Sequence, residues 1–179
     1  MKLLILDRDG VINHDSDAYI KSVEEWMPVT GSLEAMARLY QAGFRLAIAS
    51  NQSGVGRRLF TIDDLNAIHR RMVRELASLG CQVEALFFCP HTPEANCFCR
   101  KPLPGLLHEI ATRLQIDLKG VPCIGDSWRD LEAALAVGAS PILVRSGKGL
   151  RTQAAHANAL ITQGIPVFAI KGESLADYW

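Results

Sequence analysis

The chain has 179 residues, of which 49% are hydrophobic and 21% are charged, as in an ordinary globular protein. At this length we expect one domain over residues 1–179, able to bury about 70% of its unfolded surface without disulfide staples. Nineteen basic and nineteen acidic residues cancel, so no overall field favours nucleic acid or a membrane surface as a partner. Any recognition of anions must therefore be local.

The N-terminal sequence and the cysteine content are those expected of a cytoplasmic protein. MKLLILD has four consecutive apolar residues before its first acid, too few for a secretory signal. No apolar run approaches the roughly 18 residues that span a bilayer. The five cysteines are odd in number, which argues for reduced thiols or a metal site and against a disulfide framework. We also expect a monomer.

Apolar runs alternate with amphipathic helical patterns along the chain. The expected strands are residues 2–7, Phe44–Ser50, Val83–Cys89, Val121–Asp126 and Ser140–Arg145. The expected helices are SLEAMARLYQAG, TIDDLNAIHRRMVRELASLG, LPGLLHEIATRLQI, WRDLEAALAVGA and, more weakly, LRTQAAHANALITQ. Strands separated by helices predict a Rossmann-like, doubly wound α/β fold with a parallel sheet. Because no insertion exceeds a loop, we expect no separate cap domain.

Polar residues stand at the ends of three of these apolar strands. Asp7 ends the first strand within DRDGVIN, Ser50 ends the second within SNQSG, and Asp126 ends the fourth within GDSWRD. A D-x-D-G sequence alone is as typical of a surface turn. In parallel sheets, however, ligands bind beyond the carboxyl ends of the strands, near the switch in strand order. Polar residues at the ends of all three strands therefore favour a ligand-binding site over a surface turn.

We expect the carboxylates of Asp7 and Asp126 to converge, because a strand order of 3-2-1-4-5 makes their strands neighbours. Two carboxylates 4 Å apart repel by about 4 kcal/mol at an effective dielectric constant of about 20. Mg²⁺, which prefers oxygen ligands, removes this conflict. Ser50 offers a hydroxyl donor, and Lys101 of the RKP sequence offers a point charge that holds phosphate. Together these groups suit phosphoryl transfer to an aspartate nucleophile.

In this order, DRDGVIN, SNQSG, RKP and GDSWRD resemble the four motifs of the haloacid dehalogenase (HAD) superfamily of phosphatases. The resemblance covers the chain from residue 7 to about residue 130. It implies that Asp7 is the nucleophile, that Asp9 is the general acid and base, and that Ser50 and Lys101 position the phosphoryl group.

The same resemblance implies ligands for the metal and contacts for the substrate. Mg²⁺ would be held by Asp7, the backbone carbonyl of Asp9, and Asp126. The residues expected to contact substrate are Arg100, Asn51, Gln52, Ser53, Asp15 and Tyr19. For several other polar residues the sequence leaves two possible roles open. Arg57, Arg58, Arg145 and Lys148 are either ligands for a second phosphate or surface charges. Asp130 is either a first-turn helix acid or a residue behind the metal ligands, and His69, His108 and His156 are expected to be partly exposed helix residues.

The sequence FCPHTPEANCFCRKP contains a C-x-H-x5-C-x-C array formed by Cys89, His91, Cys97 and Cys99. In each half, the i, i+2 spacing places both side chains on one side of an extended segment, and the five intervening residues let the chain fold back. Three thiolates and one imidazole suit a closed structural Zn²⁺ site that staples the loop. The alternative is three unrelated reduced cysteines beside a surface histidine. Because the loop runs into RKP, zinc would also orient those cations.

This array narrows the resemblance to the zinc-containing branch, which includes D-glycero-D-manno-heptose 1,7-bisphosphate 7-phosphatases and histidinol-phosphate phosphatases. SNQSGVGR, CPH, CFCRKP and the later VRSGKG are most similar to the heptose members. The resemblance therefore implies a sugar bisphosphate substrate that loses its 7-phosphate and keeps its 1-phosphate, a step toward nucleotide-activated heptose for lipopolysaccharide. Two features depart from the branch: the gap between His91 and Cys97 is short, and Ser127 stands where many relatives carry lysine.

Three alternatives stay open from the sequence. A histidinol-phosphate phosphatase would need an acidic residue to recognise the amine of its substrate. A phospho-accepting signalling receiver also combines acids, Mg²⁺, a hydroxyl residue and lysine, but phosphorylates an aspartate after a middle strand, where this chain has Ser50. A zinc-bearing binding protein with an inactive site is the third, although all three acids of the motifs are present.

Overall fold

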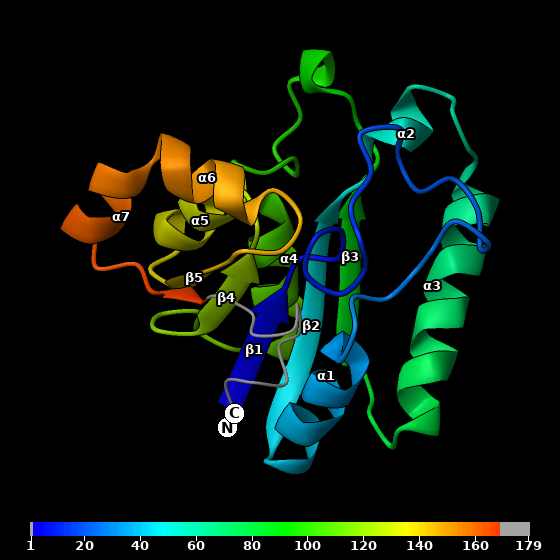
Figure 1. Ribbon diagram of the computed structural model, residues 1–179, viewed down its shortest axis with the longest axis horizontal. Helices are drawn as coiled ribbons and strands as arrows, with labels where there is room; N and C mark the ends of the chain where they lie inside the picture. The colour runs from blue at the N-terminus through cyan, green and yellow to red at the C-terminus, as the bar shows by residue number, and fades with distance from the viewer. Residues whose placement is uncertain (1, 169–179) are drawn as a thin grey trace.

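The computed structural model describes residues 2–168. Within that range, six parallel strands form one sheet in the order β3-β2-β1-β4-β5-β6 (Figure 1). The strands are β1 (Lys2–Leu6), β2 (Phe44–Asn51), β3 (Ala85–Cys89), β4 (Pro122–Gly125), β5 (Ser140–Val144) and β6 (Val167–Phe168). The predicted α/β fold and the order 3-2-1-4-5 are confirmed. β6, which extends the sheet beyond β5, was not predicted.

The helices follow the predicted alternation with two differences. They are α1 (Ser32–Gln41), α2 (Ser53–Gly56), α3 (Ile62–Ser78), α4 (Gly105–Leu114), α5 (Trp128–Ala136), α6 (Gly149–Ala155) and α7 (Ala157–Thr162). The short α2 lies where a loop was expected. The last predicted helix is two helices that meet at His156, whose ring stacks on Trp128 of α5 with 4.3 Å between the centroids.

Two apolar layers cover the two faces of the sheet. Leu4 and Leu6 of β1 point toward α1 and α3, while Leu3 and Ile5 point toward α4 and α5. This alternation explains why β1 reads as a continuous apolar run, since a central parallel strand is buried on both faces. The buried strand holds its end rigidly, which fixes the position of the residues that follow it.

The carboxyl ends of β1 to β4 lie at one edge of the sheet, where the loops gather (Figure 1). Between Leu6 and Ser32 the described chain forms turns and two isolated bridges, and no regular helix or strand. The 3₁₀ helix η1 (Pro93–Ala95) lies in the cysteine-containing loop after β3. None of the described helices is long and apolar enough to cross a membrane.

Candidate active site

One pocket of about 260 Å³ lies at this edge of the sheet. All the residues predicted to carry chemistry, bind Mg²⁺ or contact substrate line it: Asp7, Asp9, Asp15, Tyr19, Ser50, Asn51, Gln52, Ser53, Arg100, Lys101 and Asp126. Arg57, Arg129, Asp130 and Lys148 complete much of the wall. Residues distant in sequence are thus brought into one cavity by the parallel sheet.

Asp7 and Asp126 converge, as expected from the strand order. Their strands pair directly, and the backbone N–H of Asp7 donates to the carbonyl of Ile124 over 2.9 Å. One carboxylate oxygen from each of Asp7, Asp126 and Asp130 lies within 4.8 Å of the others. Burial, followed by the charges of Asp130 and Asp7, raises the pKa of Asp126, and burial is also the main cause that raises the pKa of Asp7 to about 6. A divalent cation would relieve this repulsion, so the oxygen-rich group fits Mg²⁺.

Lys101 reaches the same group of acids from the loop after β3. Its ammonium lies 2.6 Å from Oδ1 of Asp130 and 3.0 Å from Oδ1 of Asp7, and it donates to the carbonyl of Ala49 over 2.8 Å. The side chain is buried. Burial alone would lower the pKa of Lys101, but the charges of Asp130 and Asp7 outweigh it and raise the pKa. Lys101 is therefore a fixed cation beside Asp7.

Asp130 combines the two roles left open by the sequence. Its Oδ2 accepts from the backbone N–H of Ser127 over 3.0 Å and from the Ser127 hydroxyl over 2.5 Å, which closes a capping box at the start of α5. Its Oδ1 pairs with Lys101. Gly125 permits this approach, because a Cβ at that position would meet the Asp130 side chain. The helix cap thus also holds the lysine.

Asp9 is surrounded by donors. Its Oδ1 accepts from Arg8 over 2.9 Å and from Asn13 over 2.8 Å, and its Oδ2 accepts from Arg8 over 3.0 Å and from Gln52 over 2.8 Å. Burial raises the pKa of Asp9, but the Arg8 charge and these hydrogen bonds exceed that effect, so the pKa is lowered. Asp9 is therefore held as an ionised, oriented carboxylate.

Two residues predicted to contact substrate also hold other parts of the site. The Asn51 amide donates to the carbonyl of Lys101 over 3.0 Å and accepts from its N–H over 3.1 Å. The Gln52 amide nitrogen donates both to Asp9 and to the Ser50 hydroxyl, in each case over 2.8 Å. Their side chains line the pocket but already have partners. They connect residues of three separate motifs.

The loop after β5 wraps around Asp126. The backbone N–H of Lys148 donates to Oδ2 of Asp126 over 2.7 Å, and the Ser146 hydroxyl donates to the carbonyl of Gly10 over 2.5 Å. A Cβ at Gly10 or at Gly147 would collide with the Asp126 carboxylate. The Lys148 ammonium lies 2.5 Å from Asp15, so this cation already has a partner at the rim.

Three arginines, Arg57, Arg100 and Arg129, also line the pocket. Burial is the main cause of a lowered pKa at Arg100, and the nearby charges of Arg129 and Arg57 lower it further. Arg129 also donates to the Ser127 hydroxyl over 3.2 Å. A cation thus stands two residues after Ser127.

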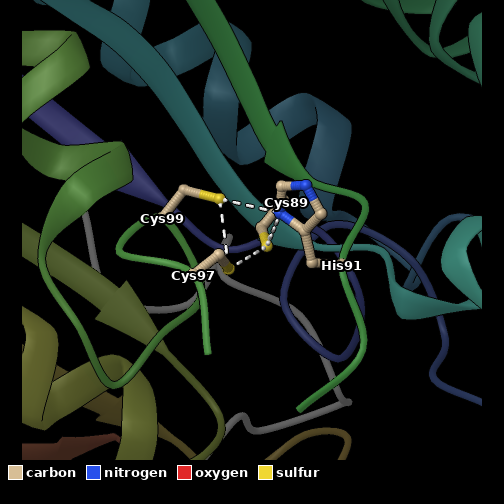
Figure 2. A group of neighbouring side chains, drawn as sticks. All are labelled: Cys89, His91, Cys97 and Cys99. Carbon is tan, nitrogen blue, oxygen red and sulfur yellow. Dashed lines mark hydrogen bonds between the residues drawn. The ribbon is translucent and has the colours of Figure 1, made fainter. Parts of the chain in front are cut away.

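The cysteine-containing loop brings its four predicted metal ligands together (Figure 2). Cys97 lies 3.5 Å from the sulfurs of both Cys89 and Cys99. The Nδ1 atom of His91 lies 3.3 Å from Cys99 and 3.6 Å from Cys89. Ligands about 2.0–2.3 Å from a tetrahedral zinc ion are separated by roughly 3.3–3.8 Å, so the four atoms fit zinc. All five cysteines are free thiols, which excludes a disulfide in this loop.

Sequence reasoning missed Arg8 and His69. Arg8 is completely buried, although it stands in the first motif between two acids. His69 was expected to be partly exposed; this was wrong, because it is buried and contacts Arg8 over 3.2 Å. The one signal in the sequence is the placement of His69 on the same helical face as Ile68, Met72 and Leu76, which are buried. Arg129 lies inside the GDSWRD motif, but no role was predicted for it.

The fold and the paired acids beside a buried lysine define the class of this protein. Residues 98–166 match the family model described as HAD-hydrolase-like, and residues 2–128 match the one described as polynucleotide kinase 3 phosphatase. The protein is a HAD-like phosphatase.

Whole-chain comparisons narrow the family. A D-glycero-beta-D-manno-heptose-1,7-bisphosphate 7-phosphatase of Bordetella bronchiseptica is 55% identical over 86% of each chain. The protein of that name in Pseudomonas putida is 51% identical over 98% of this chain and 96% of its own. The crystal structure of D,D-heptose 1,7-bisphosphate phosphatase from B. bronchiseptica, complexed with magnesium and phosphate, superimposes with a TM-score of 0.86 at 49% identity, covering 99% of this chain and 97% of the other. The chain belongs to this heptose-bisphosphate phosphatase family.

Proposed function

We propose that the protein hydrolyses the 7-phosphate of D-glycero-beta-D-manno-heptose-1,7-bisphosphate and leaves the 1-phosphate on the sugar. The observation that carries the proposal is the convergence of Asp7, Asp126 and Lys101 in one pocket that three arginines also line. The acids and the lysine suit phosphoryl transfer, and the arginines suit a second anion on the same substrate. The high identity to enzymes of this name over most of the chain supports the choice of sugar.

In the first half of the reaction, a carboxylate oxygen of Asp7 attacks phosphorus. The bond between phosphorus and the sugar oxygen breaks, and Asp9, which enters this step in its protonated form, gives that proton to the departing oxygen. In the free site Asp9 is ionised, so it takes up this proton before the first turnover, and the second half of the reaction returns it. Lys101 and the Ser50 hydroxyl hold the phosphoryl oxygens, which carry the negative charge of the transition state. The product of this half is an aspartyl-phosphate at Asp7 and the free sugar hydroxyl.

In the second half, a water attacks the phosphorus of the aspartyl-phosphate. Asp9 takes a proton from the water, the bond to Asp7 breaks, and inorganic phosphate leaves with both carboxyl groups restored. Asp9 has just lost its proton to the sugar oxygen, and its lowered pKa keeps it ionised until it accepts the proton of the water. Mg²⁺, held by Asp7, Asp126 and the carbonyl of Asp9, would supply positive charge next to the phosphoryl oxygens.

A second phosphate on the substrate would explain the three arginines that line the pocket. Arg57, Arg100 and Arg129 are well placed for the 1-phosphate because arginine binds phosphate through paired donors. Histidinol phosphate would present an amine to these arginines, and like charges would repel. Among the acids at the rim, Asp15 is already neutralised by Lys148. A sugar bisphosphate therefore fits the pocket better than an amine-bearing monophosphate.

Zinc at Cys89, His91, Cys97 and Cys99 would have a structural role. Four protein ligands leave no open position for substrate. The last ligand immediately precedes Arg100 and Lys101, and Arg100 donates to the carbonyl of His91 over 3.3 Å. Ordering this loop would therefore fix two residues: Lys101, which holds the phosphoryl group that is transferred, and Arg100, which is proposed to bind the 1-phosphate.

Phosphate release from the heptose bisphosphate, with and without Mg²⁺, tests the proposal. We expect Mg²⁺-dependent release of one phosphate per sugar, a higher kcat/KM than for histidinol phosphate, and no detectable turnover by Asp7→Asn. Asp117→Asn, an exposed acid outside the pocket, is the matched control and should keep full activity. Full activity of Asp7→Asn, or a preference for histidinol phosphate, would refute the proposed function. Stable phosphorylation without turnover would indicate a signalling receiver instead.

A further inference from the structure

Arg8 is a buried cation between the two acids of the first motif. Its Nε and Nη2 atoms donate to the two carboxylate oxygens of Asp9 over 2.9 and 3.0 Å, and its side chain has 0% exposure. This paired geometry is one that only a guanidinium provides. The third nitrogen, Nη1, contacts Nε2 of His69 over 3.2 Å.

The contact with Arg8 assigns the protonation of His69. A guanidinium has donors and no acceptor, so Nε2 of His69 must accept the hydrogen bond and carry no proton. The ring is then neutral, with its proton on Nδ1. Burial and the Arg8 charge, which lower the pKa of His69 to about 3, agree with this geometry. The ring also packs against Phe88, with 5.7 Å between the centroids.

His69 acts from outside the pocket. It lies on α3, and no residue of α3 is among the described residues that line the pocket. Hydrogen bonds therefore connect α3 to the reacting group in two steps: His69 contacts Arg8, and Arg8 contacts Asp9. Asn13 and Gln52 hold the carboxylate from its other edge.

We propose that Arg8 and His69 are positioning residues for Asp9: His69 fixes the guanidinium of Arg8, and Arg8 fixes the carboxylate that exchanges the proton. The inference rests on the role of Asp9 in the proposed function. Proton transfer needs the carboxylate within hydrogen-bonding reach of the departing oxygen, and a displacement of about 1 Å can cost roughly 100-fold in rate. A residue that never touches substrate can thus control the rate.

The test compares two phosphate esters with different leaving groups. A sugar alkoxide needs a proton to depart, whereas p-nitrophenolate does not, and kcat/KM reports the half-reaction in which they leave. We expect His69→Leu to lower kcat/KM for the sugar ester about tenfold more than for p-nitrophenyl phosphate. His69→Gln, whose amide oxygen can accept from Arg8, should restore most of the loss. Arg8→Lys should show a larger effect of the same kind.

Met72→Leu is the matched control, since Met72 is a buried residue of α3 without a polar partner in the network. It should leave the ratio of the two kcat/KM values, for the sugar ester and for p-nitrophenyl phosphate, unchanged. Thermal unfolding of every variant shows whether a loss of activity comes from a loss of folded protein. An equal loss on both esters in His69→Leu would overturn the proposal.

¹⁵N NMR of the histidines gives a readout that does not need activity. A neutral His69 protonated on Nδ1 is expected in the wild type, and a proton on Nε2 would contradict the inference. If no ester is hydrolysed, the proposed function fails, and the tautomer of His69 still decides whether the contact with Arg8 exists.

Discussion

The ammonium of Lys101 lies 2.6 Å from Asp130, closer than the 3.0 Å that separate it from Asp7. Asp130 is thus the main partner of the buried lysine, which leaves the Asp7 carboxylate less tightly paired. Asp130 also closes the capping box of α5. The Asp130 carboxylate therefore both stabilises the start of α5 and holds the Lys101 ammonium in the site.

We predict that Asp130→Asn destabilises the protein by about 3 kcal/mol, because removing one partner of a buried ion pair leaves the other uncompensated. The lysine should shift toward Asp7, and kcat should fall at least tenfold. Urea unfolding and steady-state kinetics measure the two effects. Asp63→Asn is the control, since Asp63 is an exposed acid in the first turn of α3. Unchanged kcat in Asp130→Asn would contradict the prediction.

Gly147→Ala should weaken Mg²⁺ binding. Gly147 has φ +55, and a Cβ there would meet both the Asp126 carboxylate and Gly10, so Asp126, the proposed metal ligand, must move. We expect at least a tenfold rise in the Mg²⁺ dissociation constant, measured by calorimetry. Gly80→Ala separates the clash from backbone strain, because Gly80 has φ +73 and a Cβ at that position would have nothing within 4 Å. It should cost about 1 kcal/mol of stability and leave Mg²⁺ binding intact.

Zinc content should follow the four-residue cluster. The wild type should contain one zinc ion per chain by elemental analysis, and Cys97→Ser should lose it along with several degrees of thermal stability. Cys81→Ala removes a buried thiol that lies outside the cluster and should keep its zinc. Retention of a full equivalent of zinc in Cys97→Ser would show that the cluster does not bind the ion as described.

His69 should make stability depend on pH. Its pKa is lowered to about 3 by burial and then by the Arg8 charge, against about 6.5 in the unfolded chain. Below pH 6.5 His69 binds a proton in the unfolded state but stays neutral in the folded state, so the free energy of unfolding decreases as the pH falls from 6.5 toward 3. Between pH 7.5 and 5.5, His69→Gln should lose about 1.4 kcal/mol less than the wild type in urea unfolding. Equal losses would show that His69 titrates normally.

Arg71 should affect substrate binding from a distance. It donates to the carbonyls of Val23 and Trp26 over 2.6 and 3.0 Å, and its guanidinium lies over the Trp26 ring. These contacts anchor the segment after β1 that carries Tyr19 at the rim. Arg71→Met should therefore raise KM several-fold with little change in kcat. Arg70→Met, at an exposed position of the same helix, should change neither, and a pure loss of kcat in Arg71→Met would contradict this assignment.

Much of the site could be predicted because its chemistry follows strand ends and short spacings. The periodicity of apolar residues locates β1, β2 and β4, and the rule for parallel sheets then brings Asp7, Ser50 and Asp126 to one edge. The cluster of Cys89, His91, Cys97 and Cys99 is predictable for a similar reason, since all four lie within eleven residues of one loop. Local pattern is sufficient where the contacts are local or where the topology is regular.

The sequence by itself thus determined the parallel sheet, the motif acids and the cysteine cluster. Only the tertiary structure decided that His69 supports Arg8 across 61 positions, that Asp130 pairs with Lys101, and that Arg129 enters the pocket. The reason is physical: a helical position shows in its periodicity that it is buried, but not which polar group it meets. That partner depends on how helices and loops distant in sequence pack around the sheet.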